Sequence, residues 1–339
     1  MARPFISPNV LTRPIFVGIG GDSGTGKTTL ASAFYRLFGE ERITTICLDD
    51  YHSLDRRQRE LVGFTALDPR ANNFYLMEEQ MWQLKRGETI QKPIYDHSDG
   101  HIRGPETVQP REVVIVQGLH PFLATHVRHA FDLKVWLDPE PELRLAWKVQ
   151  RDTAKRGYNV EQVEKELRAR EPDSRQWIEP QRAHADLVVR FFRPGPEAPD
   201  MGHLNVRITQ RRPLPRLAFD REIEGSGTVR IRQDAVDDDG CHADIIEIDG
   251  AITPEEAGIV ETNVWGHVDA RHHHLRHVPR EDLGAYEGAG EGAPPSKHSD
   301  PLELTQLILA HRILSAQKST LVRVTADESG ELVGHHQPL

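Results

Sequence analysis

The sequence predicts an α/β protein with a doubly wound, mainly parallel sheet and an antiparallel C-terminal extension. Three observations carry this prediction. Short apolar, β-branched runs alternate with longer amphipathic stretches through the first half of the chain, which is the pattern of βαβ units. A glycine-rich turn follows the first apolar run and leads into the first amphipathic stretch. Beyond residue 200, several short segments alternate apolar and polar residues, which indicates antiparallel strands.

The elements of the first half follow from the spacing of apolar residues. Strands are expected at residues 15–19, 43–48, 113–116 and 133–137. Helices are expected at residues 30–38, 77–85, 140–156 and 160–170. In the first of these helices the apolar residues recur on one face, and a proline at position 139 ends the strand before the third helix.

The second half begins at a stretch rich in proline and glycine, residues 193–202, which marks a boundary or a long loop. We therefore expect a nucleoside-triphosphate-binding core at 1–195 and a mixed β extension at 196–339, packed as one compact unit. Strands are expected at 204–208, 228–231 and 244–248, a flexible linker at 284–295, and a helix at 301–314 capped by Asp300.

Composition excludes several classes of protein. The chain has 339 residues, enough to bury a core without metal or disulfide support, and its two cysteines, Cys47 and Cys241, cannot form a disulfide framework. A net charge of −10 argues against a general nucleic-acid binder. No apolar run approaches the roughly 18 residues of a membrane span, and the N-terminal segment lacks the features of a secretory signal. We expect mature sequence and a cytoplasmic location, with no membrane or nucleic-acid partner.

Residues 21–28 match the phosphate-binding pattern G-x-x-x-x-G-K-[ST]. A predicted strand precedes the match and a predicted helix follows it, so backbone N–H groups and the helix N-terminus point at the phosphates. Lys27 supplies charge to the β- and γ-phosphates, and the Thr28 hydroxyl is the expected Mg²⁺ ligand. A glycine-rich turn can match this pattern by chance, but the strand and helix around it favour a true site. The candidate ATP-binding residues here are Gly21, Asp22, Ser23, Gly24, Thr25, Gly26, Lys27, Thr28 and Thr29.

The segment CLDDYHSLDRRQR, residues 47–59, follows the second predicted strand and should face the nucleotide, because ligands of open α/β sheets bind beyond the carboxyl ends of strands. A carboxylate there can take the proton of an attacking hydroxyl, and Arg56 and Arg59 can grip an anionic group. Taken alone, the segment is as often a capped turn. Residues 92–97, KPIYDH, are rich in side chains that contact sugars and phosphates, although by themselves they indicate a surface loop.

Two further segments complete the candidate site. QGLHP, residues 117–121, follows a predicted strand where a kinase with such a phosphate-binding loop usually has a second acidic residue for Mg²⁺; this chain has Gln117. Residues 148–157 resemble a mobile lid, since Lys148, Arg151 and Arg156 can close over phosphates. A solvated helix face is the alternative.

Taken together, these segments resemble the phosphoribulokinase and uridine kinase family, in its plant and cyanobacterial phosphoribulokinase form. The resemblance covers most of the chain. It is carried by GGDSGTGKTT, ICLDDYHSLDR, TALDPRANNF, KPIYDH, QGLHP and AWKVQRDTAKRGY, with weaker likeness in EIDG and the C-terminal helix. It implies a P-loop kinase fold, a homodimer, and transfer of the ATP γ-phosphoryl group to the 1-hydroxyl of ribulose 5-phosphate with Mg²⁺.

The resemblance also implies roles for individual residues. Asp49 is the base and acts with Lys27. The sugar phosphate is held by His52, Arg56, Arg59, Tyr95 and His97. Lys148, Arg151 and Arg156 bridge the two substrates, Lys148 as a substrate contact and the two arginines as ATP contacts.

The chain departs from the family pattern at two positions. Gln117 replaces a glutamate, and a unit charge about 4 Å from a cation is worth about 4 kcal/mol at an effective dielectric near 20, before desolvation. Thr25 stands where light-regulated members have the cysteine that pairs with Cys47, so that thioredoxin control is not available. The alternatives are a related kinase for another sugar phosphate or a nucleoside, and a nucleotide-binding protein weakened in catalysis by Gln117.

Two minor clusters are interpreted as structural features. His267, His272, His273, His274 and His277 are expected to form a polar surface loop, because three adjacent histidines cannot all face one ion. The run DDDG, residues 237–240, is expected to be a hairpin tip.

Overall fold

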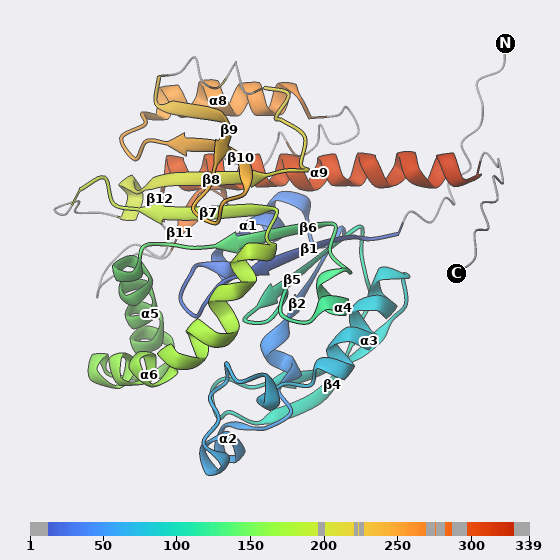
Figure 1. The fold of residues 1–339 in the computed structure, drawn as a ribbon, viewed down its shortest axis with the longest axis vertical. Coiled ribbons are helices and arrows are strands. Elements are labelled where there is room, and N and C mark those ends of the chain that lie inside the picture. The colour runs from blue at the N-terminus through green and yellow to red at the C-terminus, as the bar shows by residue number, and fades with distance from the viewer. Residues whose placement is uncertain are drawn as a thin grey trace.

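The structure, a computed structural model, describes residues 13–195, 201–219, 223, 227–268, 275, 282–286 and 297–328. Its centre is a sheet of eight strands in the order β2-β5-β1-β6-β7-β8-β10-β9, counted over those residues (Figure 1). The parallel part comprises β1 (Ile15–Gly20), β2 (Ile43–Cys47), β5 (Val113–Gly118), β6 (Leu133–Leu137) and β7 (Leu187–Phe192). The antiparallel part comprises β8 (Asn205–Arg211), β9 (Val229–Val236) and β10 (His242–Ile248).

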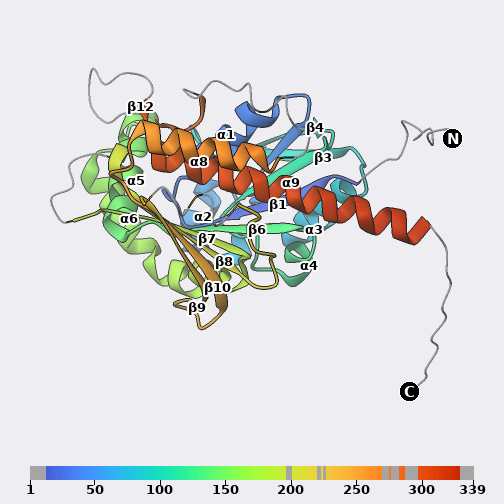
Figure 2. The same ribbon diagram turned by 90° about the horizontal axis from the view of Figure 1, so that it is seen from above.

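Helices cover both faces of the sheet (Figure 2). One face packs against α1 (Lys27–Phe38), α8 (Pro254–Gly266) and α9 (Asp300–Glu328). The other packs against α3 (Phe74–Lys85) and the short α4 (Thr125–Arg128). Strand β1 contributes to the core on both faces of the sheet. Ile15, Val17 and Ile19 pack in the core on the α1 side, and Phe16 packs in the core on the α3 side. A side chain alternates between faces along a strand, so a continuous apolar strand builds both cores.

The remaining elements lie around the end of the sheet where the parallel strands finish. They are α2 (Arg56–Val62), the hairpin β3 (Ile90–Tyr95) and β4 (Ile102–Val108), and the helix pair α5 (Pro141–Arg156) and α6 (Val160–Asp173). Short turns of 3₁₀ helix occur at Leu48–Tyr51, Pro69–Ala71, Glu179–His184 and Met201–His203, and a π-helical turn occurs at Ser174–Ile178. Strands β11 (Ala285–Tyr286) and β12 (Lys297–His298) pair with each other.

The predicted fold class is confirmed, and the antiparallel extension continues the same sheet because β8 pairs with β7. Some predictions were incomplete. The second strand ends at Cys47, one residue early, since the 3₁₀ turn begins at Leu48. The elements α2, β3, β4, α4, β7, α8, β11 and β12 were not predicted, and β11 lies in the stretch predicted to be a flexible linker. Residues 92–97 are not a surface loop; most of them form the end of β3.

Asp300 was wrongly predicted as the cap of the C-terminal helix. It lies inside α9, and Ser299 caps it instead: the Ser299 hydroxyl accepts from the Leu302 N–H at 3.4 Å, and its carbonyl accepts from the Glu303 N–H at 2.9 Å. The acidic run 237–240 is a hairpin tip between β9 and β10, as predicted. His272, His273, His274 and His277 lie outside the described residues, as do most of the predicted linker residues 284–295. In the described part of the chain, no helix combines the length and the apolar character that crossing a membrane requires.

Candidate active site

A large cleft lies where β1, β2 and β5 end. Most of the residues predicted for the site line it: Ser23, Gly24, Thr25, Gly26, Lys27, Thr28, Thr29, Asp49, His52, Arg56, Arg59, Tyr95, His97, Gln117 and Arg151. Strands β2, β5 and β1 are parallel neighbours, so their carboxyl ends and the loops that follow meet at one edge of the sheet. The fold therefore brings segments separated by about a hundred residues into one cavity.

The phosphate-binding loop turns between β1 and α1. Gly24 and Gly26 have φ values of 88° and 90°, in the left-handed region that residues other than glycine rarely adopt. The Lys27 ammonium donates to the carbonyl oxygens of Gly21 and Asp22 at 2.8 and 2.7 Å, and Thr28 at the start of α1 is exposed. The loop thus presents an ammonium group, a hydroxyl group and backbone N–H groups to the cleft, which suits a polyphosphate.

Burial lowers the pKa of Lys27 to about 8, although Asp49 and Asp22 favour its charged form. The charged lysine attracts phosphate and the neutral one does not. We therefore expect kcat/KM for ATP to fall as pH rises through about 8, because this ratio reports ionisation of the free enzyme. Initial rates from about pH 7 to pH 9 at low ATP check this expectation, and a flat profile over that interval would contradict it.

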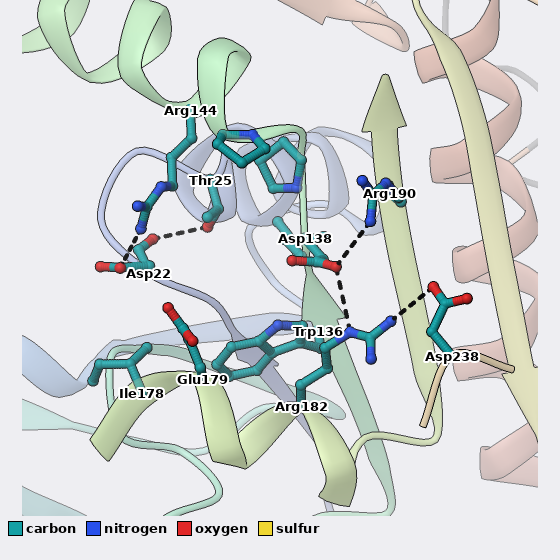
Figure 3. A pocket seen from close by; sticks show the side chains of 13 residues that line it. Asp22, Thr25, Trp136, Asp138, Arg144, Ile178, Glu179, Arg182, Arg190 and Asp238 are labelled. Carbon is teal, nitrogen blue, oxygen red and sulfur yellow. Dashed lines mark hydrogen bonds and ion pairs between the residues drawn. The ribbon is translucent and has the colours of Figure 1, made fainter. Parts of the chain in front are cut away.

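Asp22 turns away from the cleft. Its carboxylate pairs with Arg144 of α5 and accepts a hydrogen bond from the Ser174 hydroxyl at 2.5 Å, and it lines a second hollow behind the loop (Figure 3). The Thr25 side chain is buried, and its hydroxyl donates to the Asp22 carbonyl at 2.9 Å. These two side chains fix the shape of the loop.

Asp49 lies in the 3₁₀ turn directly after β2, with its Oδ2 atom 3.9 Å from His97 Nε2. Burial opposes ionisation of Asp49, but His52, His97 and Lys27 together hold its pKa below the ordinary value. Burial also lowers the pKa of His52 itself to about 4, so His52 is neutral at neutral pH. Asp49 is therefore an ionised carboxylate, ready to accept a proton.

The acceptor side of the cleft is a layered set of basic and aromatic groups. The rings of Tyr95 and His52 pack edge to face with their centroids 4.8 Å apart. The rings of Tyr95 and His97 do the same with their centroids 4.9 Å apart. Arg59 is buried and donates to the Tyr95 hydroxyl at 2.8 Å, and Arg56 donates to the His97 carbonyl at 2.7 Å. Guanidinium, imidazole and phenol groups in this arrangement can bind an anionic sugar.

Sequence reasoning missed the residue that anchors this side. Asp50 accepts from the Lys92 ammonium at 2.6 Å and from the Tyr95 N–H at 2.8 Å. This buried pair holds β3 against the turn that carries Asp49 and so places Tyr95 and His97 in the cleft. The only sequence feature that could have pointed to this role is the second aspartate of the Asp-Asp pair at positions 49 and 50.

A further group missed from the sequence is the aromatic pair beside the phosphate-binding loop. Trp147 of α5 and Phe191 of β7 line the cleft with their rings 5.9 Å apart, and Leu204 and Val206 continue this wall. Trp147 lies beside Gly26. The wall is apolar where the rest of the cleft is charged, which suits a nucleobase.

Gln117 is the penultimate residue of β5 and borders the same cleft. Its Oε1 atom is buried and makes no hydrogen bond to any residue that the structure describes. A buried acceptor of this kind normally has a partner, such as water or an ion. Together with the Thr28 hydroxyl it gives the cleft two oxygen donors, the type of ligand that Mg²⁺ prefers.

Of the two predicted basic residues of α5 whose side chains the structure describes, Arg151 lines the cleft. The Arg151 guanidinium donates to the Ser23 hydroxyl at 3.2 Å and to Asp152 at 2.8 Å. Lys148 does not line the cleft: it is fully buried, with its Nζ atom 2.8 Å from Asp152 and 3.8 Å from Glu166. The side chain of Arg156 lies outside the described residues. Substrate contacts by Lys148 and Arg156 stay predictions.

Cys47 and Cys241 are both free thiols, and Cys47 borders the cleft. Burial raises the pKa of the Cys47 thiol, which disfavours the reactive thiolate. With Thr25 in the phosphate-binding loop, we expect cycles of oxidant and dithiol to change the initial rate less than about twofold. Assays before and after each treatment check this, and a large reversible activation by dithiol would contradict it.

Comparison with known proteins agrees with this geometry. The model of the Phosphoribulokinase / Uridine kinase family matches residues 16–194, more than half of the chain. The chain belongs to this family. It is 50% identical to the phosphoribulokinase of Synechocystis sp. over 182 residues, which is 54% of this chain and 55% of that protein. A uridine kinase of Clostridium perfringens is 34% identical over 207 residues, 58% of this chain and 93% of that protein.

The chain spans about half the length of the curated phosphoribulokinases it matches; the chloroplastic one of Spinacia oleracea is 38% identical over 217 residues, 54% of that protein. The solved phosphoribulokinase from Rhodobacter spheroides has 18% identity and a TM-score of 0.53, covering 78% of this chain and 98% of that one. That likeness extends the kinase fold into the second half of the chain.

Proposed function

We propose that this family member transfers the γ-phosphoryl group of ATP to the 1-hydroxyl of ribulose 5-phosphate. The observation that carries the proposal is one cleft that holds the Lys27 loop, the ionised Asp49 and the basic and aromatic group of Arg56, Arg59, Tyr95 and His97. Such arginines favour a phosphorylated acceptor over a nucleoside. Identity to a phosphoribulokinase, 50%, also exceeds identity to a uridine kinase, 34%.

In this mechanism the substrates meet between the two loops. Backbone N–H groups of residues 21–28 and the Lys27 ammonium hold the phosphates, and the adenine ring lies against Trp147 and Phe191. The basic group on the acceptor side orients the sugar phosphate, and Asp49 takes the proton of the attacking hydroxyl. Mg²⁺, when bound near Thr28 and Gln117, would neutralise phosphate charge. We further propose that the protein is a homodimer, as the resemblance implies, and that it is cytoplasmic, as its composition favours.

The test is an ADP-release assay over a panel of sugar phosphates and nucleosides. We expect turnover with ribulose 5-phosphate well above that with every other acceptor. Preference for a different sugar phosphate or for a nucleoside would replace the acceptor in this proposal. ADP binding without turnover of any acceptor would instead favour a nucleotide-binding protein that is weakened at Gln117.

The acceptor assignment predicts a selective effect of Arg56→Ala. Arg56 borders the acceptor side of the cleft, so its loss should raise KM for ribulose 5-phosphate at least about tenfold and change KM for ATP less than about threefold. Arg57→Ala is the matched control, because Arg57 is exposed on the same helix and does not line the cleft. Equal changes in both KM values for Arg56→Ala would place this arginine outside the acceptor subsite.

A further inference from the structure

The end of α6 is a junction at which helix geometry changes. The helix ends at Asp173, a π-helical turn follows at Ser174–Ile178, and a 3₁₀ helix continues at Glu179–His184. Pro172 lies in the last turn of α6 and has no N–H group, so the regular α-helical bond pattern is interrupted there. π-Helical turns of this kind are frequent at functional sites. None of residues 173–184 lines the cleft.

Asp173 holds the acceptor side. Its Oδ2 atom accepts a hydrogen bond from the Thr65 hydroxyl at 2.6 Å, although the two residues are 108 positions apart. Thr65 lines the cleft in the loop after α2, the helix that carries Arg56 and Arg59. The same loop leads to Asn72, whose side-chain oxygen lies 2.8 Å from His52 Nδ1. Movement of Asp173 would therefore reach the groups proposed to hold the sugar phosphate.

Ser174, the next residue, holds the donor side. Its side chain is buried, and its hydroxyl donates to Asp22 Oδ2 at 2.5 Å across 152 positions of sequence. Asp22 is also paired with Arg144, as Figure 3 shows, and its carbonyl accepts from Lys27. Ser174 is thus linked through one residue to the ammonium that faces the phosphates.

The rest of the segment contacts the loop that follows β5, through Gln181. Gln181 is buried; its Oε1 atom accepts from the Phe122 N–H at 2.9 Å and its Nε2 atom donates to the Leu119 carbonyl at 2.8 Å. Leu119 and Phe122 belong to the loop that follows β5. Segment 173–184 therefore contacts the phosphate-binding loop through Ser174, the loop after α2 through Asp173, and the loop after β5 through Gln181.

We infer that Asp173 and Ser174 are positioning residues that couple binding of the phosphoryl donor to binding of the acceptor. The inference rests on the proposed function. Adjacent residues of one turn cannot move independently, so a shift of the phosphate-binding loop at Ser174 is passed to Asp173 and from there to Thr65. Coupling of this kind is reciprocal: each ligand raises the affinity of the other by the same factor.

The first test measures this factor by calorimetry. The full chain is titrated with Mg²⁺ and the non-hydrolysable ATP analogue AMP-PNP, with and without saturating ribulose 5-phosphate. We expect the parent to bind the analogue at least about fivefold more tightly when the acceptor is present. In Ser174→Ala and Thr65→Val this factor should fall to near one, while the Kd of each ligand alone changes less than about threefold.

Conservative variants separate coupling from general support of the fold. Thr65→Ser keeps the donor and Asp173→Asn keeps an acceptor oxygen, so both should retain the parental factor, whereas Asp173→Ala should lose it. The double variant Thr65→Val/Asp173→Ala should be no worse than either single variant, because both remove one hydrogen bond. Variants that melt at lower temperature yet keep the parental factor would overturn the inference.

A second readout does not depend on the identity of the acceptor. Hydrogen exchange is followed in residues 20–29 and 63–72 when Mg²⁺ and AMP-PNP bind alone. We expect protection of both segments in the parent, and of only the first in Ser174→Ala. Protection confined to residues 20–29 in the parent would overturn the coupling. Failure of the parent to bind ribulose 5-phosphate, with protection still spreading to residues 63–72, would overturn only the acceptor assignment.

Discussion

Asp49→Asn should lower kcat with ribulose 5-phosphate at least a hundredfold, the lower end of what a positioned general base contributes. The amide has nearly the shape of the carboxylate but cannot take the proton of the attacking hydroxyl. Binding of Mg²⁺-ADP should change little, because the phosphate-binding loop is held through Asp22 and not through Asp49. Calorimetry with ADP and initial rates at saturating substrates measure the two effects separately.

The control for this variant is Asp99→Asn. Asp99 is an exposed carboxylate in the turn between β3 and β4 and does not line the cleft, so its kcat should stay within about twofold of the parent. If Asp49→Asn instead lost ADP affinity and kept its turnover, Asp49 would belong to the nucleotide subsite, and another group would have to accept the proton.

The donor side of this site was predictable because its determinants are local. Residues 21–28 contain the glycines, the lysine and the threonine of a phosphate-binding loop within one turn between a strand and a helix. Asp49 could be placed by the rule that ligands bind beyond the carboxyl ends of parallel strands, because one apolar run shows where β2 ends. Both inferences need only the order of nearby elements.

The groups that sequence reasoning missed depend on distant partners. Lys92 and Pro93 are unusual residues for a strand, yet β3 pairs with β4 there, and Asp50, 42 positions before Lys92, accepts hydrogen bonds from both Lys92 and the Tyr95 N–H. The residues EPDS at 171–174 indicate only the end of a helix, while their contacts with Thr65 and Asp22 span more than a hundred positions. Lys148 shows the opposite case, because the partner that the structure gives it is local: Asp152, one turn later, forms a buried ion pair with it.

Gln117→Glu should strengthen metal and nucleotide binding together. The Gln117 Oε1 atom already lies buried at the cleft without a partner among the described residues, so glutamate would add a charge in nearly the same place. Two unit charges about 4 Å apart interact by about 4 kcal/mol at an effective dielectric near 20. Desolvation and the other oxygen ligands reduce this gain. We expect the Mg²⁺ concentration for half-maximal rate to fall about tenfold, equivalent to about 1.4 kcal/mol, with a higher kcat.

The same change should destabilise the protein without ligand, which gives a readout independent of catalysis. A glutamate carboxylate at position 117 would share the cleft with the ionised Asp49, and two like charges in a buried site repel. The melting temperature of the free variant should therefore fall below that of the parent, and Mg²⁺-ADP should raise it by more than it raises the parent's. Gln91→Glu, an exposed position on β3, should show neither effect. If Gln117→Glu gained no response to Mg²⁺ and lost activity, the neutral amide would be an integral part of this site, and the chain would use an arrangement of ligands in which residue 117 does not meet the metal.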